Sequence, residues 1–508
     1  MTSTALTLMI ITIISKITGL LREQFTSYFL GTGSLADIYS TASNIPFTIF
    51  GFIVAGVGTS FIPIYNKIKK ERGIKSADSY TANLINILVV VSMLIVGFIL
   101  VFAPWIVKIF AAGYSGEKLE LTIQFTRILS FGTTVALVSS VFIGYLNLKG
   151  SFTIPAITGI IMNLLNILTF IIAYKLNNFF IIAFGFLLSD ILKYFLFPRA
   201  LKKEHYKHRF FLNFKDDNIK LMINMSIPII ISIAAVDLST IADQSLATLV
   251  GKGEHGAVAS LRYSVLILQL ISGVIVTSIS TALFPKLSSY AVENKLVKLK
   301  KSLMESIMLA QILVIPAMVG AMVLAKPIVS IIFERGVFDA RSTAITSHVL
   351  IFYLPTLLGH SIRDLMVRAN YSLRNIKTPV RITVIEQVIN IVLSIIFSSF
   401  MGVAGLALGT SLATIMGGLM MTYKFRKTYG KINLRNFSIS TLKVLLTSMI
   451  MGIFTYYSYK LLIVFGMSKA LLGSVLISML VYAIVIVFMG IPEVKKLLNQ
   501  LYHKFIKK

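Results

Sequence analysis

Long apolar stretches alternate with short polar connections along almost the whole chain. A helix that crosses a bilayer needs roughly 20 mostly apolar residues, and by this criterion the pattern predicts fourteen membrane-spanning helices. We expect them near residues 5–30, 37–66, 80–112, 118–148, 151–175, 178–201, 218–250, 256–290, 297–334, 340–371, 378–400, 402–427, 437–464 and 468–491. The chain is therefore predicted to be an all-α integral membrane protein.

Composition also indicates that lipid is the solvent of this chain. Hydrophobic residues make up 56% of it and charged residues 13%, and its mean hydropathy is +0.85. A soluble domain has about 25% charged residues. The absence of cysteine excludes disulfide bonds, thiolate metal sites and cysteine catalysis. The N-terminal segment lacks a basic start and a small-residue cleavage site, so we expect no signal peptide.

The net charge of +28 is distributed in a way that predicts the topology. Four alternate connections are rich in Lys and Arg: residues 66–75, 199–220, 295–301 and 424–435. The intervening connections, such as 113–120 and 251–255, are short and nearly balanced. This is the positive-inside pattern, and it places the basic connections, both termini and the tail 495–508 in the cytoplasm. Because topology accounts for the charge, we expect no nucleic-acid partner.

The chain also repeats itself. The matching pairs are Thr59–Pro63 with Thr281–Pro285, Gly113 with Gly336, 154–167 with 378–391, and Gly185 with Gly409, at offsets of 222, 223, 224 and 224. An even number of predicted helices (six) separates equivalent points, so the two halves have the same orientation. The sequence thus predicts a parallel repeat, related by an axis along the membrane normal.

The repeat divides the chain into four predicted parts. They are an N-terminal six-helix lobe at 1–203, a C-terminal six-helix lobe at 217–430, two further helices at 436–492 and a basic cytoplasmic tail at 493–508. Two repeated lobes are typical of transporters that work by alternating access, with the substrate site at the interface of the repeats.

Charged residues in the first two predicted helices are candidates for that site. Lys16, Arg22 and Glu23 lie in the first helix, and Asp37 begins the second. A charge near the bilayer centre costs roughly 2.5–3.5 kcal/mol, so we expect these groups to face a polar cavity. An arginine guanidinium there can bind phosphate through two hydrogen bonds. On an ideal helix Arg22 lies about 120° from Lys16, so both face one cavity only if the helix kinks or unwinds, and Gly19 is the expected place.

The second half supplies another group of candidates. Arg262 is a further candidate substrate contact. Asp237, Glu386 and Asn390 form a candidate cation site, because two carboxylates and a carboxamide oxygen suit Na⁺ or a titrating proton. A buried polar cluster that holds helices together is an equally good interpretation of these three residues.

Two other charged groups favour structural roles. Arg363, Asp364 and Arg368 lie near the predicted cytoplasmic end of a helix, where long side chains extend toward the interface. Asp190 and Lys193 are three residues apart on one helix, which favours a local ion pair.

Several motifs carry a resemblance to a known family. They are Ser15–Glu23, Gly31–Tyr39 with Asn44–Pro46, Gly58–Pro63, Ser280–Ser288, Ile332–Asp339, Tyr371–Val380 and Gly402–Gly409. Together they resemble the MurJ/MviN proteins over most of the chain, including the fourteen-helix count. These proteins are lipid II flippases of the multidrug/oligosaccharidyl-lipid/polysaccharide exporter superfamily.

The resemblance implies a flippase for the undecaprenyl-diphosphate-linked peptidoglycan precursor, lipid II, in cell-wall synthesis. It places Lys16, Arg22, Glu23 and Asp37 at positions where the family has a basic residue, an arginine followed by an acid, and an aspartate. It implies a groove for the lipid tail formed by the last two predicted helices, 437–464 and 468–491. It further implies a cation site in the second lobe, for which Asp237, Glu386 and Asn390 are the candidates without a residue-level match.

Two departures from the family pattern leave the cargo open. The family commonly has an arginine in the second predicted helix (37–66), where this chain reads Phe50-Gly51. It has another in the eighth predicted helix (256–290), where this chain reads Ser264-Val265. Arg262, one turn earlier, is the nearest substitute for the second. A flippase for another polyprenyl-linked oligosaccharide is therefore an alternative. A drug–cation antiporter is a weaker one, because the first helix is net basic.

An enzyme is a poor match for this sequence. The predicted extracellular connections are short and offer little room for catalytic acids. No Walker motif is present, so ATP drive has no support. We expect a monomer in the bacterial cytoplasmic membrane that contacts membrane lipids, uses no cofactor and couples to the membrane potential, Na⁺ or H⁺.

Overall fold

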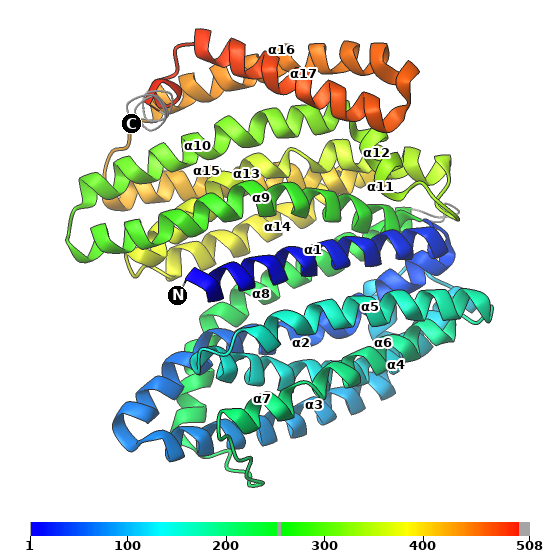
Figure 1. Cartoon of the computed structure of the whole chain (residues 1–508), viewed down its shortest axis with the longest axis vertical. Helices are drawn as coiled ribbons and strands as arrows, with labels where there is room; N and C mark the ends of the chain where they lie inside the picture. The colour runs from blue at the N-terminus through cyan, green and yellow to red at the C-terminus, as the bar shows by residue number, and fades with distance from the viewer. Residues whose placement is uncertain (1, 251–255, 497–508) are drawn as a thin grey trace. The chain divides into compact units, whose positions relative to one another are not determined.

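The computed structural model describes residues 2–250 and 256–496 (Figure 1). In this part of the chain every regular element is helical. The helices are α1 (Thr2–Leu30), α2 (Ser34–Arg72), α3 (Ile74–Phe110), α4 (Gly116–Leu148), α5 (Thr153–Lys175), α6 (Phe180–Tyr194), α7 (Phe197–Lys203), α8 (Asp217–Val250), α9 (Ala257–Val292), α10 (Leu296–Val323), α11 (Ala325–Phe333), α12 (Ala340–Tyr353), α13 (Thr356–Ser372), α14 (Lys377–Met401), α15 (Val403–Tyr429), α16 (Leu434–Leu462), a 3₁₀ turn η1 (Ile463–Phe465) and α17 (Met467–Phe488).

Three of the predicted spans are interrupted, and proline accompanies each break. The pairs are α6 with α7, α10 with α11, and α12 with α13. Pro198 and Pro327 lie in the first turn of α7 and α11, and Pro355 directly precedes α13. Proline lacks an N–H and clashes with the preceding turn, so it is tolerated where a helix begins. The bend between α12 and α13 is 43°.

With each interrupted pair taken as one segment, the described residues form the fourteen segments that the sequence predicts. Twelve helices are long and apolar enough to cross a membrane, or thirteen if α12 and α13 form one span. Helix α1 is not among these, and it carries Lys16, Arg22 and Glu23. The predicted all-α membrane fold is confirmed.

The order of elements also confirms the repeat. Helices α2 and α9 begin at Ser34 and Ala257, 223 residues apart. Helices α5 and α14 begin at Thr153 and Lys377, 224 residues apart. Helices α16 and α17 follow as an addition to the repeat. They pack against each other, and α16 packs on α10 (Figure 1).

The chain forms two compact units. The first contains residues 1–259 and Arg335–Asp339, and the second contains Ser260–Glu334 and 340–508. Within the first unit α2 packs on α4 and α8, and α1 packs on α5. Within the second, α15 packs on α13 and α14. These units reflect packing, whereas the lobes 1–203 and 217–430 reflect a sequence repeat, so the lobe boundaries stay a prediction. The end of the predicted basic tail, 497–508, lies outside the described residues.

Candidate functional site

An ion pair lies within the charged segment of α1. Arg22 Nη2 donates to Glu23 Oε1 at 2.5 Å, and the two side chains are 23% and 5% exposed. The Arg22 Nε atom is buried and makes no hydrogen bond to any described residue. The predicted neighbours Arg22 and Glu23 are therefore brought together, and most N–H donors of the guanidinium remain outside this pair.

Lys16 lies on the same helix with its side chain exposed. The opposite side of α1 packs on α5, where Asn163 Nδ2 donates to Thr18 Oγ1 at 3.3 Å. Helix α1 continues without interruption through Gly19, so the unwinding considered there does not occur. An added Cβ at Gly19 would lie 3.5 Å from Asn163 Nδ2, an ordinary contact, so the position does not require glycine.

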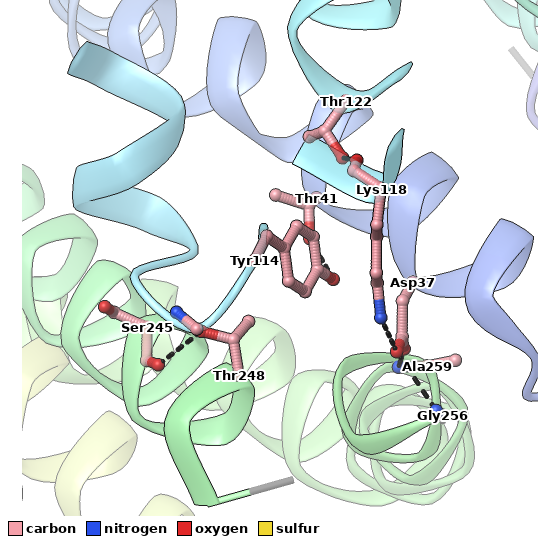
Figure 2. Close-up of polar contacts among 10 residues, drawn as sticks. Asp37, Thr41, Tyr114, Lys118, Thr122, Ser245, Thr248, Gly256 and Ala259 are labelled. Atoms are coloured by element: carbon pink, nitrogen blue, oxygen red, sulfur yellow. Dashed lines mark hydrogen bonds and ion pairs between the residues drawn. The ribbon is translucent and has the colours of Figure 1, made fainter. Parts of the chain in front are cut away.

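Asp37 is almost fully enclosed by hydrogen-bond donors (Figure 2). Its carboxylate accepts from Lys118 Nζ at 2.9 Å and from the backbone N–H groups of Gly256 and Ala259 at 3.0 Å each. Gly256 directly precedes α9 and Ala259 lies in its first turn, where backbone N–H groups lack helical partners. Asp37 is 2% exposed. These contacts give Asp37 the role of a cap on α9, and its predicted contact with substrate stays a prediction.

The surroundings of this carboxylate are also ordered (Figure 2). The Tyr114 hydroxyl lies 3.1 Å from Thr41 Oγ1, and the Lys118 ammonium lies 4.3 Å from the Tyr114 ring centroid. Burial, and then the Asp37 charge, raises the pKa of Tyr114, so its hydroxyl stays protonated. The Gly113 N–H donates to Thr248 Oγ1 at 3.0 Å. The end of α8 is thus hydrogen-bonded to the turn after α3, and the start of α9 is hydrogen-bonded to α2.

The second unit contains a comparable ion pair. Arg363 Nη1 on α13 donates to Glu386 Oε1 on α14 at 2.6 Å, and the two side chains are 20% and 2% exposed. An added Cβ at Gly417 of α15 would lie only 2.1 Å from Glu386 Oε2, so α15 passes directly beside the carboxylate. Asn390 is buried one turn further on α14, and its Oδ1 accepts from Ser394. A guanidinium therefore occupies one side of the candidate cation ligand Glu386.

The remaining predicted residues are divided between the two units. Arg262 is partly buried on α9 in the second unit. Asp237 is partly buried on α8 in the first unit, and its Oδ2 makes no hydrogen bond to a described residue. Among the described residues no group of three His, Asp or Glu side chains is arranged to hold a metal ion. A cation site that combines Asp237 with Glu386 and Asn390 stays a prediction.

Sequence reasoning missed two partners, Lys118 and Arg363. The second could have been found from spacing. Arg363 precedes Leu373 by ten residues and Glu386 follows Ile376 by ten, and the turn between α13 and α14 lies between them. Residues equally far from a tight turn lie at the same depth in an antiparallel helix pair. No comparable signal connects Lys118 to Asp37, which is 81 residues away.

Comparisons with known proteins cover nearly the whole chain. A family model described as "Lipid II flippase MurJ" matches residues 26–490. Two relatives carry the name "Probable lipid II flippase MurJ". The one from Rickettsia prowazekii is 28% identical over 428 residues, 82% of each chain. The one from Thermotoga maritima is 25% identical over 497 residues, 97% of each chain.

Solved structures show the same fold. The structure titled "Lipid II flippase MurJ, inward closed conformation" has a TM-score of 0.80 at 24% identity and covers 99% of this chain and 100% of that chain. An inward-facing multidrug resistance MATE family transporter of the MOP superfamily has a TM-score of 0.69 at 18% identity, covering 82% of this chain and 98% of that chain. With the family model matching most of the sequence, the chain belongs to the MurJ family of lipid II flippases, a family of multi-pass membrane transporters.

Proposed function

We propose that this protein moves lipid II from the inner to the outer leaflet of the bacterial cytoplasmic membrane. Isolated charges cannot cross hydrocarbon alone, because burying them costs far more than binding usually supplies. A polar, cationic cavity replaces water around the diphosphate-sugar headgroup while the polyprenyl tail remains in lipid. Alternating access of the two lobes then changes the side to which the cavity opens.

Beside family membership, the observation that carries the proposal is the incomplete hydrogen bonding of the Arg22 guanidinium. Its guanidinium is partly exposed in a helix that the sequence predicts to span the membrane, and its one hydrogen bond among the described residues goes to Glu23. A guanidinium has five N–H donors in a planar fork that suits phosphate. Together with Lys16, it leaves this segment of α1 with a net positive charge.

The orientation follows from the alternate basic connections. We place both termini and the basic connections in the cytoplasm by the positive-inside rule. The chain has no cysteine, so single cysteines can be introduced without background. The orientation is tested with single cysteines in place of Ser76, at the start of α3, and Ser115, shortly after its end. A membrane-impermeant thiol reagent added to intact cells should label position 115 and spare position 76. The reverse labelling would contradict the orientation.

Energy coupling is the next part of the proposal. Moving one charge through 100 mV is worth about 2.3 kcal/mol, so an inside-negative potential draws an empty, net-cationic cavity toward the cytoplasm. Collapsing the potential should therefore slow turnover. The Glu386 carboxylate is the further candidate for Na⁺ or H⁺ coupling, and replacement of Na⁺ by K⁺ at constant pH separates the two ions.

Helices α16 and α17 are the proposed groove for the lipid tail. Both expose many large apolar side chains, such as Leu446, Phe454, Leu472 and Leu480. The pair is held by the Thr455 and Ser478 hydroxyls, 2.6 Å apart, and the Tyr482 hydroxyl donates to the Ile312 carbonyl of α10 at 2.7 Å.

The function is tested by rescue of a bacterium depleted of its own lipid II flippase. Expression of this chain should restore growth and cell shape. Failure of the well-expressed chain would contradict lipid II as cargo. Purified protein in vesicles, supplied in turn with lipid II and with another polyprenyl-diphosphate oligosaccharide, should move lipid II faster. The family model and the names of the relatives favour this cargo over the alternative.

A further inference from the structure

A cavity lies in the first unit, and no residue of α1 or α2 lines it. It has a volume of about 930 Å³ and lies between α3, α4, α6, α7 and the connection 204–216. Volumes of roughly 300–1,000 Å³ are typical of pockets for small molecules. Its wall is mostly apolar and includes Val89, Val138 and Phe142. Neither Arg22 nor Asp37 lines it, so the cavity is separate from the charged groups discussed above.

One side of the cavity meets the lipid-facing surface of α6. Ile191 and Phe195 line the cavity and are 39% and 66% exposed. Phe184 and Leu188 continue the same exposed stripe at helical spacing. In a membrane-spanning helix, an exposed apolar stripe contacts hydrocarbon. A lipid chain can therefore enter the cavity sideways from the membrane.

The opposite wall is the connection between α7 and α8, which is fixed in place. Asn86 Nδ2 on α3 donates to the carbonyls of Arg209 and Phe211 at 2.9 Å each. Asn83 on α3 and Asn213 exchange two hydrogen bonds of 2.9 and 2.8 Å. Two asparagines on one face of α3 thus hold this connection as a wall of the cavity.

The same connection is basic and aromatic. Residues 199–220 contain seven Lys or Arg and three Asp or Glu. Lys202 lines the cavity, and Lys207 and Arg209 are exposed nearby, none of the three in an ion pair with a described residue. Phe210 and Phe214 are 92% and 55% exposed. Basic and aromatic side chains together at a membrane interface are typical of contact with anionic lipid headgroups.

We propose that this cavity binds one phospholipid with a net negative headgroup, from the leaflet that faces the basic connections. One acyl chain lies in the apolar cavity, and the phosphate lies at Lys202, where its charge complements the basic connection. The proposal goes beyond cargo transport, because the lipid is a bound component of the first unit and is not moved across the membrane.

Native mass spectrometry of the purified full-length protein tests the site. The probes are phosphatidylglycerol and phosphatidylcholine with identical acyl chains, added separately over a concentration series. We expect one phosphatidylglycerol to bind with an affinity at least fivefold higher than that of phosphatidylcholine. Loss of one basic contact at a membrane surface corresponds to about fivefold, so Lys202→Glu should weaken binding five- to tenfold.

Two controls make the result decisive. Lys215→Glu changes an exposed lysine of the same connection that does not line the cavity, and it should bind within twofold of the parent. Val135→Trp fills the cavity and should abolish tight binding, whereas Leu188→Trp on the adjoining lipid-facing stripe should not. Equal binding of the two lipids, an unaffected Lys202→Glu variant, or equal losses in the Lys202 and Lys215 variants would overturn the proposal. Because Lys202 is exposed, its variant should fold even if the Val135 variant does not.

Discussion

Asp37 and Arg22 lie near each other in the sequence and both were predicted to contact substrate, but their surroundings differ. Asp37 is 2% exposed, and its two oxygens accept three hydrogen bonds from Lys118, Gly256 and Ala259. The Arg22 side chain is 23% exposed and makes one hydrogen bond, to Glu23, among the described residues. A satisfied, enclosed charge stabilises structure, whereas a partly satisfied charge in a predicted membrane helix such as α1 remains available to a ligand.

The largest effect on stability is expected from Asp37→Ala. This change leaves the Lys118 ammonium and two backbone N–H groups without their acceptor. Removing one partner of a buried ion pair costs about 3–5 kcal/mol, and we expect about 3 kcal/mol because Lys118 is 21% exposed. Unfolding of the purified protein in detergent measures it. An unchanged unfolding temperature would contradict the capping role of Asp37.

Arg22→Ala should act on function. A hydrogen bond to a charged group contributes about 1.5–3 kcal/mol, so transport of lipid II by the folded protein should fall roughly 10- to 100-fold. The change also leaves the buried Glu23 carboxylate without its Arg22 partner, so some loss of stability is expected, and transport is compared at temperatures where both proteins are folded. Arg22→Lys should recover part of the activity, because lysine keeps the charge but loses the planar fork. Parental transport by Arg22→Ala at equal protein levels would remove Arg22 from the site.

Gly256→Ala tests the same cap on α9 by changing the backbone that donates to Asp37. Gly256 has φ +98°, and an added Cβ would lie 2.1 Å from the Thr32 carbonyl oxygen. Strained backbone of this kind costs about 1–3 kcal/mol. The backbone at position 256 must also move to avoid Thr32, which should weaken the cap on α9. The matched control is Gly150→Ala, at φ +79° with no neighbour within 4 Å. Thermal unfolding should show the larger loss at Gly256, and equal losses would argue against the close approach.

Lys16→Gln should have the smallest effect. Lys16 is exposed, and an exposed charge contributes only about 1 kcal/mol or less. Transport should fall less than about fivefold. A loss as large as that of Arg22→Ala would show that both cations bind the headgroup equally.

The sequence predicted the helices well because apolar length alone decides whether a segment can span a membrane. It did not predict the three breaks. Pro198, Pro327 and Pro355 accompany breaks, but Pro46 and Pro285 lie inside uninterrupted helices. Neighbouring helices and side chains can satisfy the backbone groups that a proline frees, so the outcome depends on tertiary packing.

The candidate site was predicted only in part, because some of its contacts also depend on tertiary packing. Arg22 and Glu23 are adjacent in the sequence, so their ion pair follows from local geometry. The role of Asp37 depends on backbone N–H groups of Gly256 and Ala259, 219 and 222 residues away. Backbone donors leave no signature in the residue types of a sequence, so a carboxylate that caps a distant helix is easily taken for one that binds substrate.

Binding of lipid II to purified protein tests the central claim most directly, with the parent, Arg22→Ala and Asp37→Asn compared in the same detergent. Affinity and unfolding temperature are measured on each sample. The account predicts that Arg22→Ala binds roughly 10- to 100-fold more weakly at temperatures where it is fully folded, and that Asp37→Asn unfolds earlier but, while folded, binds lipid II with parental affinity. Parental affinity in Arg22→Ala, or lost affinity in Asp37→Asn at an unchanged unfolding temperature, would contradict it.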